Sequence, residues 1–151
     1  MSEKKVVSRT LAIALGIICV ILAVGLVGAI AQITSLQNQI SDLTSIVNLA
    51  KSTVWVNNQI VNQPHNSYTF WTFSASYAGY VSVNVQTSTT DKTYVQVIYS
   101  SHGVSYNNQI GVGTGGKVVF PILPSSSIEI RVGNTNWISG ATETVTITYY
   151  Y

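Results

Sequence analysis

Residues 11–31 read LAIALGIICVILAVGLVGAIA and carry no charged side chain. At about 1.5 Å per residue, a helix of this length crosses the roughly 30 Å hydrocarbon core of a bilayer. We therefore predict a transmembrane helix whose partner is the lipid bilayer. Small residues spaced four apart within it would let two such helices approach closely. The residues that we assign to this membrane anchor are Leu11, Ala12, Gly16, Cys19, Gly25, Ala29 and Ala31.

The charged residues on either side of this segment predict its orientation. Lys4, Lys5 and Arg9 lie in the tail of residues 1–10, and the next positive residue is Lys51. Because positive charges are retained in the cytoplasm, we expect a cytoplasmic N-terminus and an extracellular C-terminal domain. No later stretch is long and apolar enough to cross back, so we predict a single pass through the cell membrane.

A cleaved signal peptide is the main alternative to an anchor. Ala29-Ile30-Ala31 has the small-x-small form that signal peptidase accepts, and the basic tail also fits. The apolar run is longer than the roughly 7–15 residues of a typical signal peptide. Its length therefore favours an uncleaved anchor.

The helical period continues over residues 32–52, which we predict to form a helical stalk. Apolar residues recur there at alternating spacings of three and four, and this is a heptad pattern. Its β-branched and leucine positions favour a parallel two-stranded coil, so a homo-oligomer through residues 11–54 is expected. A single amphipathic helix packed against its own domain fits the same pattern, and both interpretations stay open. The heptad seam consists of Ile33, Leu36, Ile40, Leu43, Val47 and Ala50.

From residue 53 to residue 151 the apolar period changes from helical to alternating. Alternation of apolar and polar residues predicts strands with one buried and one solvent-exposed face. We therefore predict a mainly β fold, an antiparallel β-sandwich of about seven to nine strands, jelly-roll or immunoglobulin-like. The long N-terminal helix precedes it. The alternating rows are 81–85, 95–99, 128–132 and 145–149, and turn signals include Asn57-Asn58, Pro64, His102-Gly103, Gly111 to Gly116 and Gly133-Asn134.

Few residues in this domain suggest chemistry. Gly111 to Gly116 matches the spacing of the dinucleotide fingerprint, but residues 117–120 read as a strand where that motif requires a helix. We therefore predict a glycine-rich hairpin turn there. His65 and His102 are far apart and lack neighbouring ligands at metal-binding spacing. We expect no catalytic, cofactor-binding or metal site and therefore no enzyme.

Aromatic residues and net charge bear on the kind of partner. Tyr80, Tyr106 and Trp137 could form a stacking surface for sugars, although aromatic residues in a sandwich more often fill the core or pair across strands. Three positive and three negative residues cancel from residue 53 onward, so nucleic acid is not an expected partner. The single cysteine, Cys19, excludes an intramolecular disulfide, so the sandwich must be stable through packing and strand pairing alone.

Three families share features with this sequence. The start, SRTLAIALGIICVILAVGLVGAIA followed by ITSLQNQISDLTSI, resembles uncharacterised archaeal surface proteins with an anchor and heptads. The segments Tyr68-Thr69-Phe70, Ala78 to Val81 and Ile130-Arg131-Val132 are similar in rhythm to the prokaryotic pre-peptidase C-terminal jelly roll. The overall layout also resembles archaeal type IV pilins, which implies processing near Arg9-Thr10 and a helix packed inside a filament.

These observations predict an anchored surface protein with a structural or adhesive role and no catalysis. A pilin-like subunit of an extracellular filament is the first alternative, and a carbohydrate-binding surface module is the second. The expected partners are the lipid bilayer, a second copy of the chain, and a surface glycan or protein.

Overall fold

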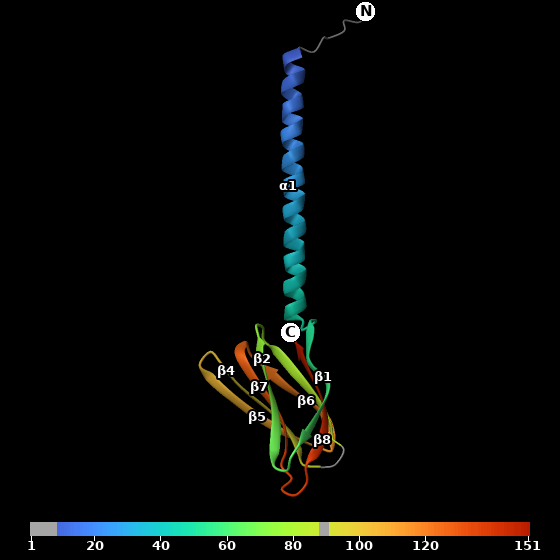
Figure 1. Cartoon of the computed structure of the whole chain (residues 1–151). Coiled ribbons are helices and arrows are strands. Elements are labelled where there is room, and N and C mark those ends of the chain that lie inside the picture. The colour runs from blue at the N-terminus through green and yellow to red at the C-terminus, as the bar shows by residue number, and fades with distance from the viewer. Residues whose placement is uncertain (1–8, 88–90) are drawn as a thin grey trace, which may run out of the picture. The chain divides into compact units, whose positions relative to one another are not determined.

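The computed structural model describes residues 9–87 and 91–151 of the chain. The chain divides into two compact units, Met1–Thr44 and Ser45–Tyr151. Most of the predicted basic tail, residues 1–8, lies outside the described residues. Helix α1 (Arg9–Val47) is followed by strands β1 (Ser52–Gln63), β2 (Ser67–Ala75), β3 (Gly79–Thr87), β4 (Thr93–Ser101), β5 (Val104–Gly113), β6 (Gly115–Ile122), β7 (Ser125–Asn134) and β8 (Ala141–Tyr150) (Figure 1).

Helix α1 joins the predicted membrane segment and most of the predicted stalk in one continuous element. Its span Ala12–Val47 has a mean hydropathy of 3.0 in its most apolar stretch, and none of that stretch is buried. By length and composition it can cross a membrane, and an N-terminal signal sequence would meet the same criterion. Hydroxyl groups are accommodated within the helix, because Thr34 and Thr44 donate hydrogen bonds to the carbonyls of the preceding turn.

The helix ends earlier than the heptad pattern predicts. Leu49 adopts a left-handed conformation with φ of 53°. The amide of Leu49 donates to the carbonyl of Ile46 at 3.0 Å, and that of Ala50 donates to Ser45 at 2.8 Å. This pair of bonds is a Schellman motif, which satisfies the last carbonyls of a helix and terminates it. The prediction of a helix to residue 52 is therefore wrong, and Ala50 does not belong to a helical seam.

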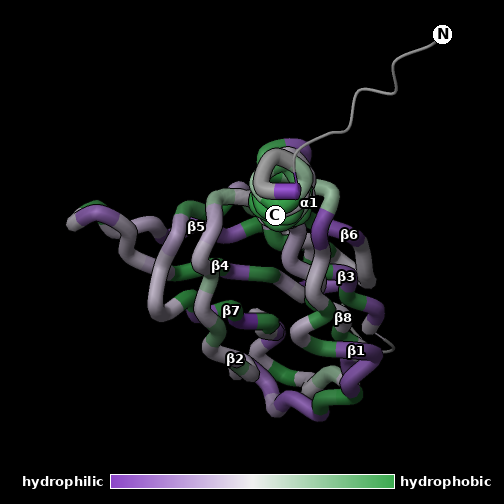
Figure 2. Tube along the Cα trace, turned by 90° about the horizontal axis from the view of Figure 1, so that it is seen from above, coloured by the Kyte–Doolittle hydropathy of each residue, from purple (hydrophilic) through white to green (hydrophobic). Residues whose placement is uncertain are grey.

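The eight strands form two four-stranded antiparallel sheets. Sheet A has the order β1-β8-β3-β6, and sheet B has the order β2-β7-β4-β5. Figure 2 shows the strands of sheet B and sheet A in these orders as two facing layers. Among the described strands, β4 and β5 are the only consecutive pair that are neighbours in one sheet. The β-sandwich prediction is confirmed, and this strand order is that of a jelly roll rather than an immunoglobulin domain.

The alternating rows point inward, as predicted. The apolar members of all four rows are buried, whereas their polar neighbours are exposed or half-buried. Ser82 is the exception, since it is buried on a strand that lies between two neighbours in sheet A. The fully buried core residues of these rows are Val81, Val83, Val85, Val95, Val97, Ile128, Ile130, Val132, Val145 and Ile147.

Two predicted turns have a different role. Asn57 and Asn58 lie within β1, where the pairing with β8 shifts register and Asn58 has φ of 45°. Asparagine tolerates this conformation. The backbone amide of Asn58 donates to Thr146 Oγ1 at 3.1 Å, and Thr146 Oγ1 donates to Asn58 Oδ1 at 2.9 Å, so these two bonds hold the bulge. Gly111 to Gly116 does not form a hairpin, because β5 pairs in sheet B and β6 pairs in sheet A. The glycines instead let the chain cross between sheets.

Gly115 provides a direct test of this crossing. Its φ is 149°, and a Cβ atom there would lie 2.8 Å from the carbonyl oxygen of Val85. We expect Gly115→Ala to destabilise the sandwich by about 1–3 kcal/mol through this overlap and the backbone strain. Gly111→Ala is the matched control, since a Cβ there meets no atom within 4 Å.

The measurement is urea unfolding of the full chain in detergent, followed by tryptophan fluorescence. All three tryptophans lie in Ser45–Tyr151, so the signal reports on the sandwich. Equal unfolding midpoints for Gly115→Ala and Gly111→Ala would contradict the role of Gly115 in the crossing between the sheets.

Candidate functional site

The residues assigned to the membrane anchor all lie in helix α1. From Ala12 onward their side chains are exposed, including that of the free cysteine Cys19. A Cβ added at Gly16 or Gly25 would meet nothing within 4 Å. Exposed apolar surface of this extent is characteristic of a segment that lipid or another chain covers.

The seam residues that fall within α1 are also exposed. Ile33, Leu36, Ile40 and Leu43 are each more than half accessible, and Val47 is the last residue of the helix. Their spacing places them on one helical face. The seam therefore ends at Val47 and offers an apolar stripe along the C-terminal half of α1.

The three aromatic residues predicted to form a sugar-binding surface are not brought together. Tyr80 stacks on Tyr150 at 4.7 Å between ring centroids, and Tyr106 stacks on Tyr99 at 4.6 Å. Trp137 lies in the connection from β7 to β8, at the opposite end of β8 from Tyr150. Tyr80 and Tyr106 thus each pair with a tyrosine on the neighbouring strand. Such cross-strand pairing is the alternative to a sugar-binding surface that the sequence leaves open.

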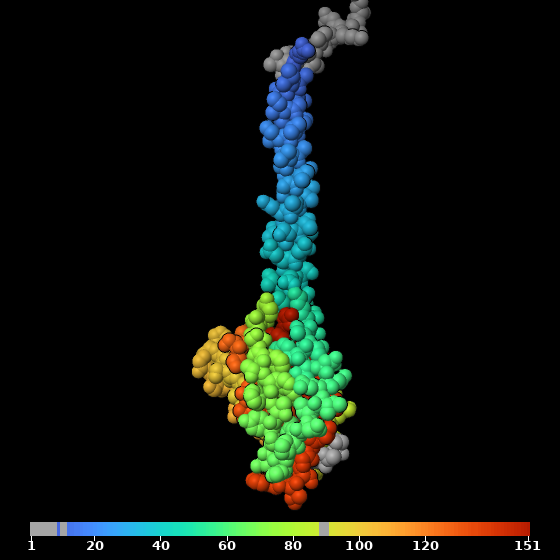
Figure 3. All heavy atoms as spheres, viewed as in Figure 1, coloured from blue at the N-terminus to red at the C-terminus, as the bar shows by residue number. Residues whose placement is uncertain are grey.

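Trp137 and its neighbour Ile138 form an exposed apolar tip. They are 77% and 90% exposed, respectively. The loop that carries them is held by side-chain hydrogen bonds, because the Asn136 Oδ1 accepts from the amides of Ile138 at 2.9 Å and Ser139 at 3.1 Å. Asn134 Nδ2 donates to the Ser139 carbonyl at 2.8 Å. The segment around residues 135–140 is orange-red at the lower end of the molecule in Figure 3. Ordered apolar side chains in this position suit a contact surface.

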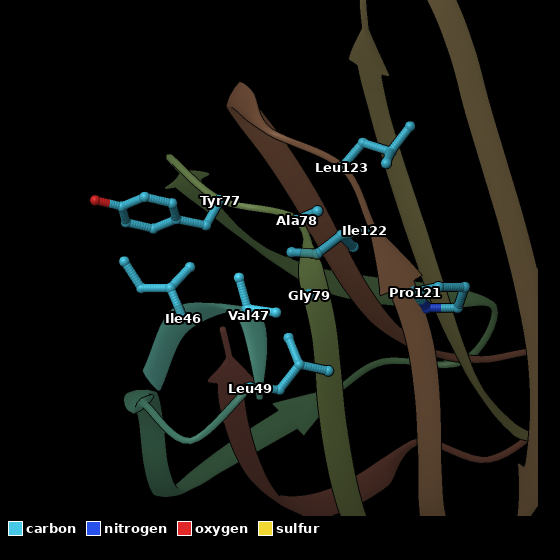
Figure 4. A pocket seen from close by; sticks show the side chains of 9 residues that line it. All are labelled: Ile46, Val47, Leu49, Tyr77, Ala78, Gly79, Pro121, Ile122 and Leu123. Atoms are coloured by element: carbon cyan, nitrogen blue, oxygen red, sulfur yellow. The ribbon is translucent and has the colours of Figure 1, made fainter. Parts of the chain in front are cut away.

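An apolar groove lies near the other end of the sandwich. It has a volume of about 520 Å³ and is formed by the helix terminus, the β2–β3 connection and the end of β6. Figure 4 shows how these three segments converge. The sequence did not predict the groove, because its members are distant in the chain. The lining residues are Ile46, Val47, Leu49, Tyr77, Ala78, Gly79, Pro121, Ile122 and Leu123.

A buried polar cluster, which we call the Glu143 cluster, links the two sheets. Glu143 of β8 is fully buried and accepts hydrogen bonds from Gln63 Nε2 at 2.6 Å and from Thr93 Oγ1 at 3.1 Å. Gln63 Nε2 also donates to the carbonyl of Val132 at 2.6 Å. Glu143 and Gln63 belong to sheet A, whereas Thr93 and Val132 belong to sheet B. The sequence does indicate that Glu143 points inward, because it lies two residues before the buried Val145 and therefore on the same face of β8.

Burial raises the pKa of the Glu143 carboxyl above its ordinary value of 4.5, and the hydrogen bonds from Thr93 and Gln63 oppose this effect only in part. The folded sandwich therefore holds this proton to a higher pH than the unfolded chain. Stability from this group is complete below pH 4.5 and is lost as the pH rises through the raised folded value.

Glu143→Gln tests this linkage, since it removes the titration and keeps the shape. We expect the unfolding free energy of the unchanged chain to decline as the pH rises above 4.5, and this decline to be reduced in the variant. Glu129→Gln is the control, because Glu129 is only partly buried and is paired with Arg131. A decline of equal size in Glu143→Gln and the unchanged chain would rule out Glu143 as its source.

The remaining candidates for chemistry do not assemble. His65 follows Pro64 at the end of β1, whereas His102 lies in the turn between β4 and β5, with its Nδ1 2.9 Å from Ser101 Oγ. Within residues 9–87 and 91–151, no group of three or more histidine, cysteine, aspartate or glutamate residues could hold a metal ion.

Comparisons with known proteins bear on the fold. No family model matches the sequence, and no curated protein matches it. The crystal structure of tripeptidyl peptidase 2 is similar over 65% of this chain, with a TM-score of 0.50 and 8% identity. This chain spans only 10% of the length of that one.

Two further solved structures belong to small domains. The pre-peptidase C-terminal domain of a collagenase from Bacillus anthracis has a TM-score of 0.44 and 13% identity, with 60% of this chain and 88% of that chain covered. PliG, a periplasmic lysozyme inhibitor from Aeromonas hydrophila, has a TM-score of 0.42 and 12% identity, with 65% and 85% covered. At these identities the likeness concerns the fold alone. The helix and the strand order of this chain themselves define a membrane-length N-terminal helix followed by a jelly-roll β-sandwich.

Proposed function

We propose that this chain is a single-pass surface protein, anchored in the cell membrane by α1, with a structural or adhesive role. In this proposal residues 1–10 lie in the cytoplasm, residues 11–31 span the bilayer and the sandwich is extracellular. The observation that carries it is the exposed apolar surface of Ala12–Val47, whose most apolar stretch has a mean hydropathy of 3.0. A surface of this kind needs lipid or protein to cover it.

The sandwich supports a role in contact rather than in catalysis. Its charges cancel from residue 53 onward, and its buried carboxylate, Glu143, is held by hydrogen bonds between the sheets. Its exposed apolar features include the tip at Trp137 and Ile138 and the groove beside Leu49 and Leu123. These features suit partners that are recognised by shape and apolar surface.

Membrane integration is tested by extraction of cell membranes with alkaline carbonate. We expect the unchanged chain to stay in the membrane pellet and Val20→Arg to shift toward the soluble fraction. An arginine near the centre of a spanning helix costs about 2.5–3.5 kcal/mol. Gln37→Arg is the matched control, since Gln37 lies on α1 outside residues 11–31.

Complete extraction of the unchanged chain would overturn the anchor.

Orientation is read in intact cells with a membrane-impermeant amine reagent. Under this proposal the reagent labels Lys117, whose side chain is exposed in the sandwich, and leaves Lys4 and Lys5 unlabelled.

A pilin-like subunit is the second candidate function. The apolar stripe from Ile33 to Val47 favours it, because this stripe lies beyond the predicted membrane segment and would be covered by neighbouring helices in a filament. The same α1 would then serve as the assembly element.

The intact mass of the chain isolated from its own cells separates these functions. A chain that keeps Met1, or loses only that residue, is expected for the anchor, because the basic tail remains. A mature N-terminus at Leu11 would favour the filament. A start at Gln32 would show signal cleavage and exclude both.

A further inference from the structure

Strand β5 is an edge strand without the usual protection against pairing. It is the outermost strand of sheet B and extends from Val104 to Gly113. Its sequence, VSYNNQIGVG, contains no charged residue and no proline. Its pairing with β4 is regular from Ser101↔Val104 to Tyr94↔Gly111 and shifts only at the far end. The backbone groups that point away from β4 are therefore presented along an edge that no bulge interrupts between Val104 and Gly111.

Two of the three other edge strands, β6 and β1, differ from β5 in this respect. Strand β6 carries Lys117 and Pro121, both of which hinder strand addition. Strand β1 is interrupted by two register shifts around Val56. Strand β2 also lacks charged residues and proline, but its Trp71 side chain reaches across to sheet A, where Trp71 Nε1 donates to Gln59 Oε1 of β1 at 3.1 Å.

We propose that β5 pairs antiparallel with β5 of a second copy, which joins the two B sheets into one continuous sheet. This proposal rests on the proposed adhesive role and names its partner. The β4–β5 hairpin, gold in Figure 3, forms the flank at which the second copy would bind. Pairing through a strand edge uses main-chain hydrogen bonds for affinity and side-chain rows for register.

In this arrangement the side chains of the two β5 strands match one another. A two-fold axis perpendicular to the sheet keeps each face of the strand against the same face of its partner. One face therefore brings apolar rows together, and the other brings together the polar row that includes Asn107. Gln96 Nε2 of β4 already donates to Asn107 Oδ1 at 2.7 Å, so the Asn107 amide can donate onward to the next strand. The apolar row consists of Val104, Tyr106, Ile110 and Val112, with Asn108 at its centre.

The antiparallel arrangement also determines where strand β1 of each copy begins relative to the joined sheet. The β4–β5 turn lies at the end of the sandwich where β6 ends, since Ser101 Oγ donates to the Pro124 carbonyl at 2.7 Å. Strand β1 begins at this same end, because Ser52 pairs with Tyr150 and Tyr150 with Tyr80 beside the end of β6. The two-fold axis reverses the strand direction, so the ends at which β1 begins in the two copies lie at opposite ends of the joined sheet along the strand direction. Two facing surfaces would supply this geometry, so the contact is suited to adhesion between like cells.

Vesicle clustering tests the contact with the full chain. The chain is reconstituted into phosphatidylcholine vesicles, flotation confirms that it is membrane-bound, and light scattering measures clustering. We expect the unchanged chain to cluster vesicles and Asn108→Lys to reduce clustering to the level of protein-free vesicles, because like charges meet near the axis. Asn57→Lys, on the exposed bulge of β1, is the matched control and should cluster normally.

A mixture of vesicles gives a second readout. Vesicles bearing Asn108→Lys should cluster with vesicles bearing Asn108→Glu, since opposite charges then meet. Tryptophan fluorescence confirms that each variant is folded. Clustering that persists in Asn108→Lys, or that is absent for a membrane-bound unchanged chain, overturns the β5 contact and leaves the anchor standing.

Disulfide cross-linking tests the pairing without a membrane. Opposed residues of antiparallel strands have Cα atoms about 4.5–5.5 Å apart, which a disulfide can span. In a Cys19→Ser background in detergent, Asn108→Cys should give a covalent dimer on oxidation, and Asn57→Cys should not. If flotation fails but this dimer forms, the anchor is wrong and the β5 contact stands. Absence of the dimer in folded chains counts against the contact.

Discussion

The sandwich depends on the packing of two sheets through their alternating apolar rows. Valine and isoleucine side chains from β3, β4, β7 and β8 are fully buried between the layers. Because the single cysteine, Cys19, lies in α1, this packing is not reinforced by a disulfide within the sandwich. Close contact between the sheets is therefore required along the strands, and every connection between consecutive strands except that from β4 to β5 leads from one sheet to the other.

Several polar and aromatic features follow from this requirement. At one end, Gln63 and Glu143 reach from sheet A to the Val132 carbonyl and Thr93 in sheet B, so both carboxylate oxygens of Glu143 accept a hydrogen bond. Along the β1–β2 side, Trp55 stacks on Phe73 at 4.4 Å and on Tyr149 at 4.9 Å. The aromatic residues thus close the core at the side where β1 and β2 meet.

The same packing decides which surfaces remain for partners. Once the inward rows are buried, the sandwich presents its loop ends and its strand edges. The Asn134 and Asn136 side chains support a loop that exposes Trp137 and Ile138, while β5, the outermost strand of sheet B, carries no charged residue. The low charge of these surfaces agrees with the balance of three positive and three negative residues from residue 53 onward.

The sequence by itself determined the membrane-length helix and the inward faces of the strands, since both follow from local periodicity that neighbouring residues share. Only the tertiary structure decided the rest. Leu49 and its backbone bonds end the helix before Ala50, and the assignment of β5 and β6 to different sheets makes Gly115 a crossing. The separation of Tyr80, Tyr106 and Trp137 and the convergence of Gln63, Thr93 and Glu143 likewise depend on strand order. Strand order is set by contacts between residues far apart in the chain, and a local pattern of apolar and polar residues carries no information about which strands become neighbours.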